Sequence, residues 1–184
     1  KKICMTRFVS TYLYPQQNAA QTRDRSYRVI TPSRQASRAI AARYQPLHDT
    51  AIKALEQHDQ VMAPPLQAQK LFRQTVQDVL QPADLLGAAR AFMPAVRSLL
   101  QSRSSLECNS NNLSARALNL ITLARQYQLA LRKTGFYDEG ELYWRAAELD
   151  ISPQKILVYG YFQPRPDELA WIDKLAADES IVFL

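Results

Sequence analysis

Apolar residues near the N-terminus follow the pattern of a strand and then that of a helix. Tyr27 to Ile30 (YRVI) has the character of a short strand, and Thr31 and Pro32 end it. Ser33 then offers an N-cap, and apolar residues recur at steps of three and four between Ala36 and Tyr44. We therefore expect a strand, a tight turn and a helix in the first quarter of the chain.

The middle of the chain, from about Leu47 to Leu149, is almost entirely helical in pattern. Prolines mark the boundaries of the first amphipathic helix, with Pro64 and Pro65 before it and Pro82 after it, and Pro94 lies inside the second helix. A Ser- and Asn-rich loop from Ser102 to Asn112 precedes the third helix, which ends at Gly135. Pro94 predicts a kink or a break in its helix. Asp138 is a suitable cap for a shorter helix that follows.

The C-terminal quarter alternates strand and helix. Lys155 to Tyr159 (KILVY) and Ile181 to Leu184 (IVFL) have the character of buried strands, and a helix with Leu169 and Leu175 lies between them. Two such strands joined by a helix form a βαβ unit, whose strands pair in parallel with both faces covered. Because the chain stops inside the last strand, we expect it to be the N-terminal part of a longer protein.

Together these patterns predict an α/β fold with two parts. Residues 1–46 and 150–184 would form one parallel sheet with its helices, and residues 47–149 an all-helical subdomain inserted into it. Of the 184 residues, 47% are hydrophobic and 22% are charged, as in a soluble globular chain. No apolar run approaches the ~20 residues of a membrane span, and the N-terminus lacks the apolar core of a secretory signal. We therefore expect a cytoplasmic protein without membrane contact.

Basic side chains are concentrated at the N-terminus. Residues 1–45 hold nine Lys or Arg and one acid, whereas the remaining 139 residues hold 14 basic and 16 acidic side chains. Such an excess could meet a polyanion such as nucleic acid, or it could simply keep a helix face solvated. Charge alone leaves both interpretations open.

Catalytic and metal-binding patterns are missing from the sequence. A phosphate-binding loop of the form GxxxxGK[ST] does not occur, and Ile156 to Tyr161 carries no carboxylate that would order Mg²⁺ at the end of a core strand. His48 and His58 would lie about 15 Å apart along a helix, too far to share one metal ion. We expect no cofactor, no bound metal and no enzymatic activity of this chain itself.

Three segments together resemble a known family. They are Arg28 to Arg43 (RVITPSRQASRAIAAR), Pro64 to Arg73 (PPLQAQKLFR), and Gly135 to Leu184 with its runs GFYDEGELYWRAA and ILVYGYFQPRPDELAWIDKL. The first is similar to the strand-to-helix motif of superfamily 1 helicases, in which Pro and a small hydroxyl residue abut single-stranded DNA. The other two resemble the helical insert and the core of the N-terminal helicase-like region of AddB-type helicase-nucleases. Those proteins bear a RecB-like nuclease domain.

The resemblance implies a parallel sheet like that of P-loop NTPases and of the helicase 1A domain, with a large all-helical insertion. The phosphate-binding loop that some family members keep is absent between Thr6 and Leu13, and Tyr159 and Gly160 stand where an active helicase has Asp-Glu. The implied domain is therefore degenerate: it would bind DNA in the repair of DNA breaks but would not hydrolyse ATP. The implied partners are single-stranded DNA, a nuclease domain further along the same protein, and a partner helicase subunit.

The site residues that the resemblance implies follow the first strand. Thr31, Ser33 and Arg34 would contact phosphates from the turn and the helix N-terminus, and Arg38 and Arg43 would extend this track. The structural alternative for Thr31 and Ser33 is that they end the strand and cap the helix.

Other functions also remain open. The helical stretch could be the surface of a protein interaction scaffold that makes no nucleic-acid contact, and nucleotide hydrolysis through a nonstandard loop is an enzymatic alternative. Trp144 and Trp171 could stack on bases, but their apolar neighbours favour packing in the core. We assign the acids that begin at Asp138 and Asp167 to helix capping, since carboxylates stabilise helix N-termini.

Overall fold

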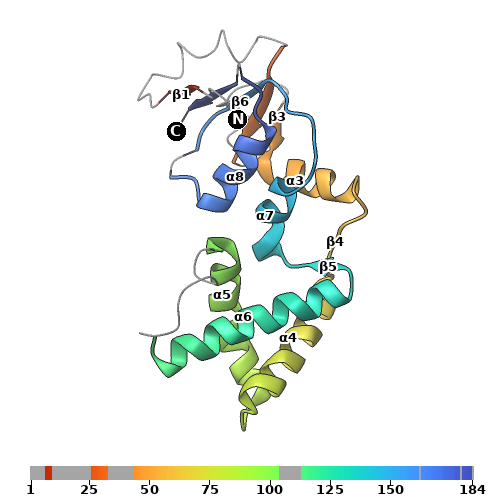
Figure 1. Ribbon diagram of the computed structural model, residues 1–184, viewed down its shortest axis with the longest axis vertical. Helices are drawn as coiled ribbons and strands as arrows, with labels where there is room; N and C mark the ends of the chain where they lie inside the picture. Colours follow the sequence, from red (N-terminus) through yellow and green to blue (C-terminus); the bar gives the residue numbers. More distant parts are fainter. Residues whose placement is uncertain are drawn as a thin grey trace. The chain divides into compact units, whose positions relative to one another are not determined.

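The computed structural model describes residues 7–9, 26–32, 44–103, 113–161, 163–178 and 180–183 (Figure 1). The chain forms two compact units. The first comprises Lys1–Ala54 and Tyr143–Leu184, and the second is the continuous segment Leu55–Leu142. From the sequence, the inserted subdomain was expected to span residues 47–149, whereas the second unit of the structure spans Leu55–Leu142. Most of the helix that begins at Leu47 therefore belongs to the first unit.

The described elements alternate between short strands and helices. The elements of the first unit are β1 (Arg7–Val9), β2 (Arg28–Thr31), β3 (Tyr44–Pro46), α3 (Leu47–Glu56), α7 (Leu142–Ala147), β6 (Ile156–Val158), α8 (Pro166–Leu175) and β7 (Ile181–Phe183). Those of the second unit are β4 (Val61–Met62), α4 (Pro65–Leu80), α5 (Leu85–Ser102), α6 (Ala115–Lys133), β5 (Phe136–Tyr137) and the short 3₁₀ helix η3 (Glu139–Glu141).

The first unit contains a parallel sheet with the strand order β1-β7-β6-β2-β3. Within this sheet, β2 from the N-terminal part of the chain pairs with β6 from the C-terminal part, and Val29 of β2 lies opposite Leu157 of β6. The mixed α/β class is thereby confirmed, as is the prediction that strands from the two ends of the chain form a parallel sheet. All three residues of β6 are buried, as expected for a strand covered on both faces.

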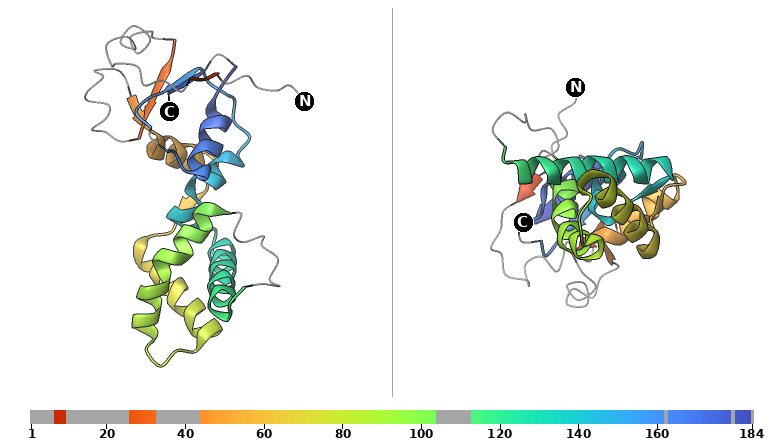
Figure 2. Two further views of the ribbon diagram at one scale, coloured as in Figure 1. Left: turned by 90° about the vertical axis from the view of Figure 1, so that its left-hand side faces the viewer. Right: turned by 90° about the horizontal axis from the view of Figure 1, so that it is seen from below.

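Helices α3 and α8 lie on the same side of this sheet (Figures 1 and 2). The indole Nε1 of Trp171 on α8 donates a hydrogen bond to Oγ1 of Thr50 on α3 over 2.9 Å. Trp171 is fully buried, so its predicted place in the core is confirmed. At the start of α8, the backbone N–H of Arg165 donates to the carboxylate of Glu168, which confirms the capping role expected of this acidic segment.

Helices α4, α5 and α6 pack around a common core in the second unit (Figure 2). Phe72 of α4 and Tyr127 of α6 meet edge to face, with ring centroids 5.1 Å apart. Asp84 caps α5 by accepting from the N–H of Gly87, and Ser114 caps α6 by accepting from the N–H of Ala117. These caps satisfy N–H groups that the helices themselves cannot pair.

Three local features of the second unit differ from the sequence prediction. Helix α5 continues through Pro94 to Ser102 without a break, because Val96 and Leu100 are buried beyond the proline and hold that half in place. The strands β4 and β5 pair in parallel, but with two residues each they are too short to show a periodicity of two. Asp138 does cap a helix, accepting from the N–H of Gly140, yet this first turn is the 3₁₀ helix η3.

Candidate nucleic-acid interface

The carboxyl ends of β2 and β6 meet at one edge of the sheet. Thr31 closes β2 and is fully buried, and exposed Pro32 follows it. On the neighbouring strand, the backbone N–H of Tyr159 donates to the carbonyl oxygen of Ile30 over 2.9 Å. The turn after β2 therefore begins beside the segment that leaves β6.

The chain leaves these two strands in opposite directions. β2 leads to β3 on its outer side, whereas β6 leads to β7 on the other side. In open parallel sheets, ligands bind in the crevice outside the carboxyl ends of the strands at such a switch point. The topology thus singles out the β2–β6 edge as the place for a ligand on this sheet.

Beyond β6, the edge is formed by Tyr159, Gly160 and Tyr161. Gly160 has a φ of +82°, a backbone conformation that side chains with a Cβ rarely adopt, so a glycine is favoured where the chain turns away. No carboxylate stands in this segment. Among the residues that the structure describes, no group of three or more His, Cys, Asp and Glu side chains gathers as a metal site would require.

A polar cluster follows this edge at the start of α8. Arg165 donates from Nε to Oδ1 of Asp167 over 3.0 Å, and its Cζ lies 5.7 Å from the ring centroid of Tyr143. Burial raises the pKa of Tyr143 and that of Tyr161, so both phenols keep their protons to a higher pH than an exposed tyrosine would. The Arg165 charge is thus used within the fold, where it neutralises a buried carboxylate.

Arg28 belongs to the basic N-terminal quarter but lies at the opposite, amino end of β2. Its guanidinium donates to Oε1 of Gln154 over 2.7 Å and also to the side chain of Gln45. Burial lowers the pKa of Arg28. This arginine therefore connects β2 to its neighbours and is not available at the β2–β6 edge.

The structure places only one of the residues that the resemblance assigned to DNA. Thr31 lies at the β2–β6 edge, and its full burial favours the strand-ending role over a direct contact. Ser33, Arg34, Arg38 and Arg43 lie outside the described residues. Sequence reasoning had not placed Gly160 and its two tyrosines in the site, although a glycine directly after an apolar strand is a signal for an edge turn.

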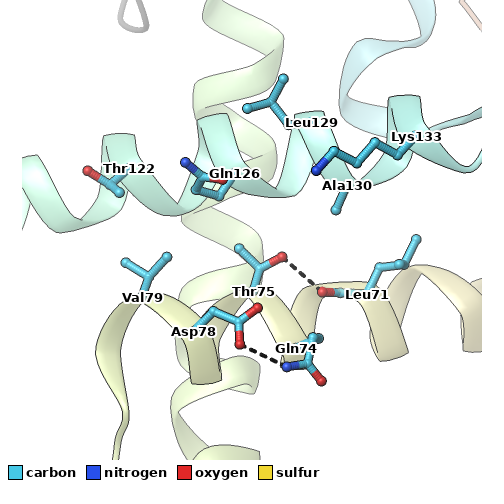
Figure 3. Close-up of a pocket in the computed structure, with 10 residues that line it drawn as sticks. All are labelled: Leu71, Gln74, Thr75, Asp78, Val79, Thr122, Gln126, Leu129, Ala130 and Lys133. Atoms are coloured by element: carbon cyan, nitrogen blue, oxygen red, sulfur yellow. Dashed lines mark hydrogen bonds between the residues drawn. The ribbon is translucent and has the colours of Figure 1, made fainter.

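The second unit carries a groove between α4 and α6 (Figure 3). It encloses about 560 Å³ and combines aliphatic side chains with amides and hydroxyls. No residue of it was proposed as functional from the sequence, because Leu71 and Val79 follow the spacing of core positions.

Compared with protein families and with curated proteins, the chain matches no family model and gives no significant match to a curated protein. In the part of the chain that the structure describes, no helix has the length and apolar character needed to cross a membrane.

Proposed function

We propose that this chain is a degenerate helicase-like domain of P-loop type from an AddB-type helicase-nuclease, and that it binds the backbone of single-stranded DNA at the β2–β6 edge. The observation that supports the proposal is the strand order: β2 connects to a strand on one side and its parallel neighbour β6 to a strand on the other, which makes their carboxyl ends a topological switch point of the kind at which ligands bind. Pro32 follows Thr31 at this edge, in agreement with the helicase motif that the sequence resembles.

The charge of the chain supports a polyanionic ligand. The segment that follows Thr31 contains Arg34, Arg38 and Arg43 and no acidic residue before β3. Backbone phosphates are bound by such side chains together with helix N-termini, without a sequence preference. In this proposal Ser33 and Arg34 contact phosphates, Arg38 and Arg43 extend the contact, and Thr31 positions the turn.

The domain would contribute binding and docking and no chemistry of its own. Its sequence lacks both the phosphate-binding loop and the acid for Mg²⁺, so ATP hydrolysis is not part of the proposal. Cleavage of DNA would belong to a nuclease domain further along the same protein, and unwinding to a partner helicase subunit. Both follow from the resemblance to AddB-type proteins.

Fluorescence anisotropy with a labelled single-stranded oligonucleotide tests DNA binding at low salt. We expect the variant with Arg34→Ala and Arg38→Ala to bind at least about tenfold more weakly, since each hydrogen bond to a charged group contributes on the order of 1.5 kcal/mol. The matched control is Arg90→Ala, which removes an exposed arginine on α5 and should leave the affinity unchanged. The proposal would be overturned if the wild type did not bind the oligonucleotide at low salt. It would also be overturned if the double variant and Arg90→Ala lost equal amounts of affinity.

A protein interaction scaffold is the second candidate function. The groove between α4 and α6 favours it, because a partly aliphatic groove between two helices is a common site for a further helix.

A further inference from the structure

The phosphate contacts proposed at the β2–β6 edge do not by themselves distinguish a single strand from a duplex. Both forms of DNA present backbone phosphates, and contacts to phosphates carry no information about the bases. A single strand differs because its bases are unstacked and are able to stack on aromatic side chains of a protein. An edge that selects single-stranded DNA therefore needs an aromatic ring within reach of a base.

The segment that leaves β6 contains two tyrosines, and they differ in accessibility. Tyr161 is only 8% exposed. Tyr159 is half-buried, and exposed Gly160 follows it directly. Pro32, which follows the neighbouring strand β2, is also exposed. Tyr159 is therefore the ring at this edge that a ligand is able to reach.

The backbone of Tyr159 is held by strand β2. Its N–H donates to the carbonyl oxygen of Ile30 over 2.9 Å, and Ile30 lies opposite Val158 in the parallel register. This bond continues the ladder by one residue beyond β6 and brings Tyr159 level with Thr31. The tyrosine thus stands beside the turn that begins after β2.

The side chain of Tyr159 packs against the buried pair Val29 and Leu157, and so does the side chain of Tyr27. Alternate residues of a strand share a face, so these four side chains line one face of the sheet. Tyr27 directly precedes β2 at the amino end, whereas Tyr159 directly follows β6 at the carboxyl end. Of these two tyrosines, only Tyr159 lies at the switch point. A side chain already held by the sheet loses little freedom when a base stacks on it.

We propose that Tyr159 stacks on a base of single-stranded DNA at the β2–β6 edge and thereby selects an unstacked strand over a duplex. Val29 and Leu157 support the ring from the sheet, and its exposed part meets the base. Every base has an aromatic face, so this contact brings no sequence preference. The inference rests on the DNA binding proposed above and adds a base contact to its phosphate contacts.

The test measures fluorescence anisotropy of the full chain with three labelled probes: a single-stranded oligonucleotide, its duplex, and a strand of the same length made of abasic sites. Tyr159→Leu removes the aromatic ring but keeps an apolar side chain for packing against Val29 and Leu157. We expect this variant to bind the single strand about tenfold more weakly, and the duplex and the abasic strand as the wild type does, because neither offers an unstacked base. Tyr159→Phe keeps the ring and should bind all three probes like the wild type.

Tyr27→Leu is the matched control, since Tyr27 packs against the same two residues but lies at the opposite end of the strands. We expect it to leave the affinity for the single strand unchanged. Salt gives a second comparison: stacking releases no counterions, so Tyr159→Leu should lower the affinity by the same factor at every salt concentration.

Three results would overturn the inference while DNA binding itself stands. They are equal losses in Tyr159→Leu and Tyr27→Leu, an equal loss of Tyr159→Leu on the abasic strand, and a loss in Tyr159→Phe as large as that in Tyr159→Leu. If the wild type bound no oligonucleotide at low salt, the proposed function and this inference would both fail. The two failures are therefore distinguishable.

Discussion

The hydroxyl of Tyr127 on α6 donates a hydrogen bond to Oδ2 of Asp138 over 2.9 Å. The same carboxylate accepts from Nε of Arg97 on α5 over 3.1 Å and from the backbone N–H of Gly140 in η3 over 2.9 Å. Since the Asp138 side chain is only 1% exposed, these donors replace the water that a carboxylate would otherwise bind. One buried acid thereby joins three elements of the second unit.

Removal of this carboxylate should destabilise the second unit strongly. We expect Asp138→Ala to lower the free energy of unfolding by about 3–5 kcal/mol, because Arg97 and two further donors lose their buried acceptor. Urea unfolding followed by circular dichroism measures this change. The adjacent acid supplies the control: Glu139 is 60% exposed and lies 3.8 Å from Arg97. Glu139→Gln should cost less than about 1 kcal/mol, and equal costs for the two variants would contradict the role of Asp138.

The buried tyrosines make stability depend on alkaline pH. Burial, with a smaller contribution from the charge of Glu56, raises the pKa of Tyr137 to about 12. In the unfolded chain the phenol ionises near pH 10, so above that value the unfolded state releases its proton first. The stabilisation from Tyr137 is therefore complete below pH 10 and is lost as the pH rises toward 12.

Urea midpoints measured at increasing alkaline pH test this dependence. We expect the midpoint to fall above about pH 10, and to fall less steeply in the Tyr137→Phe variant, which has no phenol to ionise. An identical decline in the two proteins would show that Tyr137 does not hold its proton in the folded state.

Gly160 should tolerate only residues that accept a positive φ. With φ at +82°, an alanine at this position should destabilise the first unit by about 1–2 kcal/mol, whereas Gly160→Asn should cost less because Asn enters this region more readily. Thermal unfolding of the two variants gives the comparison. If Gly160→Ala unfolds at the same temperature as the wild type, the turn after β6 does not require this conformation.

Much of the first unit could be predicted from the sequence because buried parallel strands have a distinct pattern. The apolar runs before Tyr159 and after Ser180 indicated a parallel pair, and the neighbours of Trp171 indicated its place in the core. Helix-breaking residues were less informative: of the kink or break that Pro94 predicted, the break does not occur, because tertiary packing holds both halves of α5 in one helix.

The candidate sites could be predicted only in part. Thr31 was placed at the end of a strand because Pro32 follows it, but its burial depends on neighbouring strands that local pattern does not specify. The groove depends on how α4 and α6 pack, and Leu129 looks like any other leucine at helical spacing. Sites made by packing leave no local signal in the sequence.

The salt dependence of DNA affinity tests the central claim most directly. The logarithm of the association constant for a single-stranded oligonucleotide should fall linearly with the logarithm of the salt concentration, since bound phosphates release counterions. Replacing both Arg34 and Arg38 by Ala should reduce the magnitude of this slope by about 1.4, the value for two lost phosphate contacts on a single strand. A slope in the double variant equal to that of the wild type, or an affinity that does not respond to salt, would contradict DNA binding at this edge.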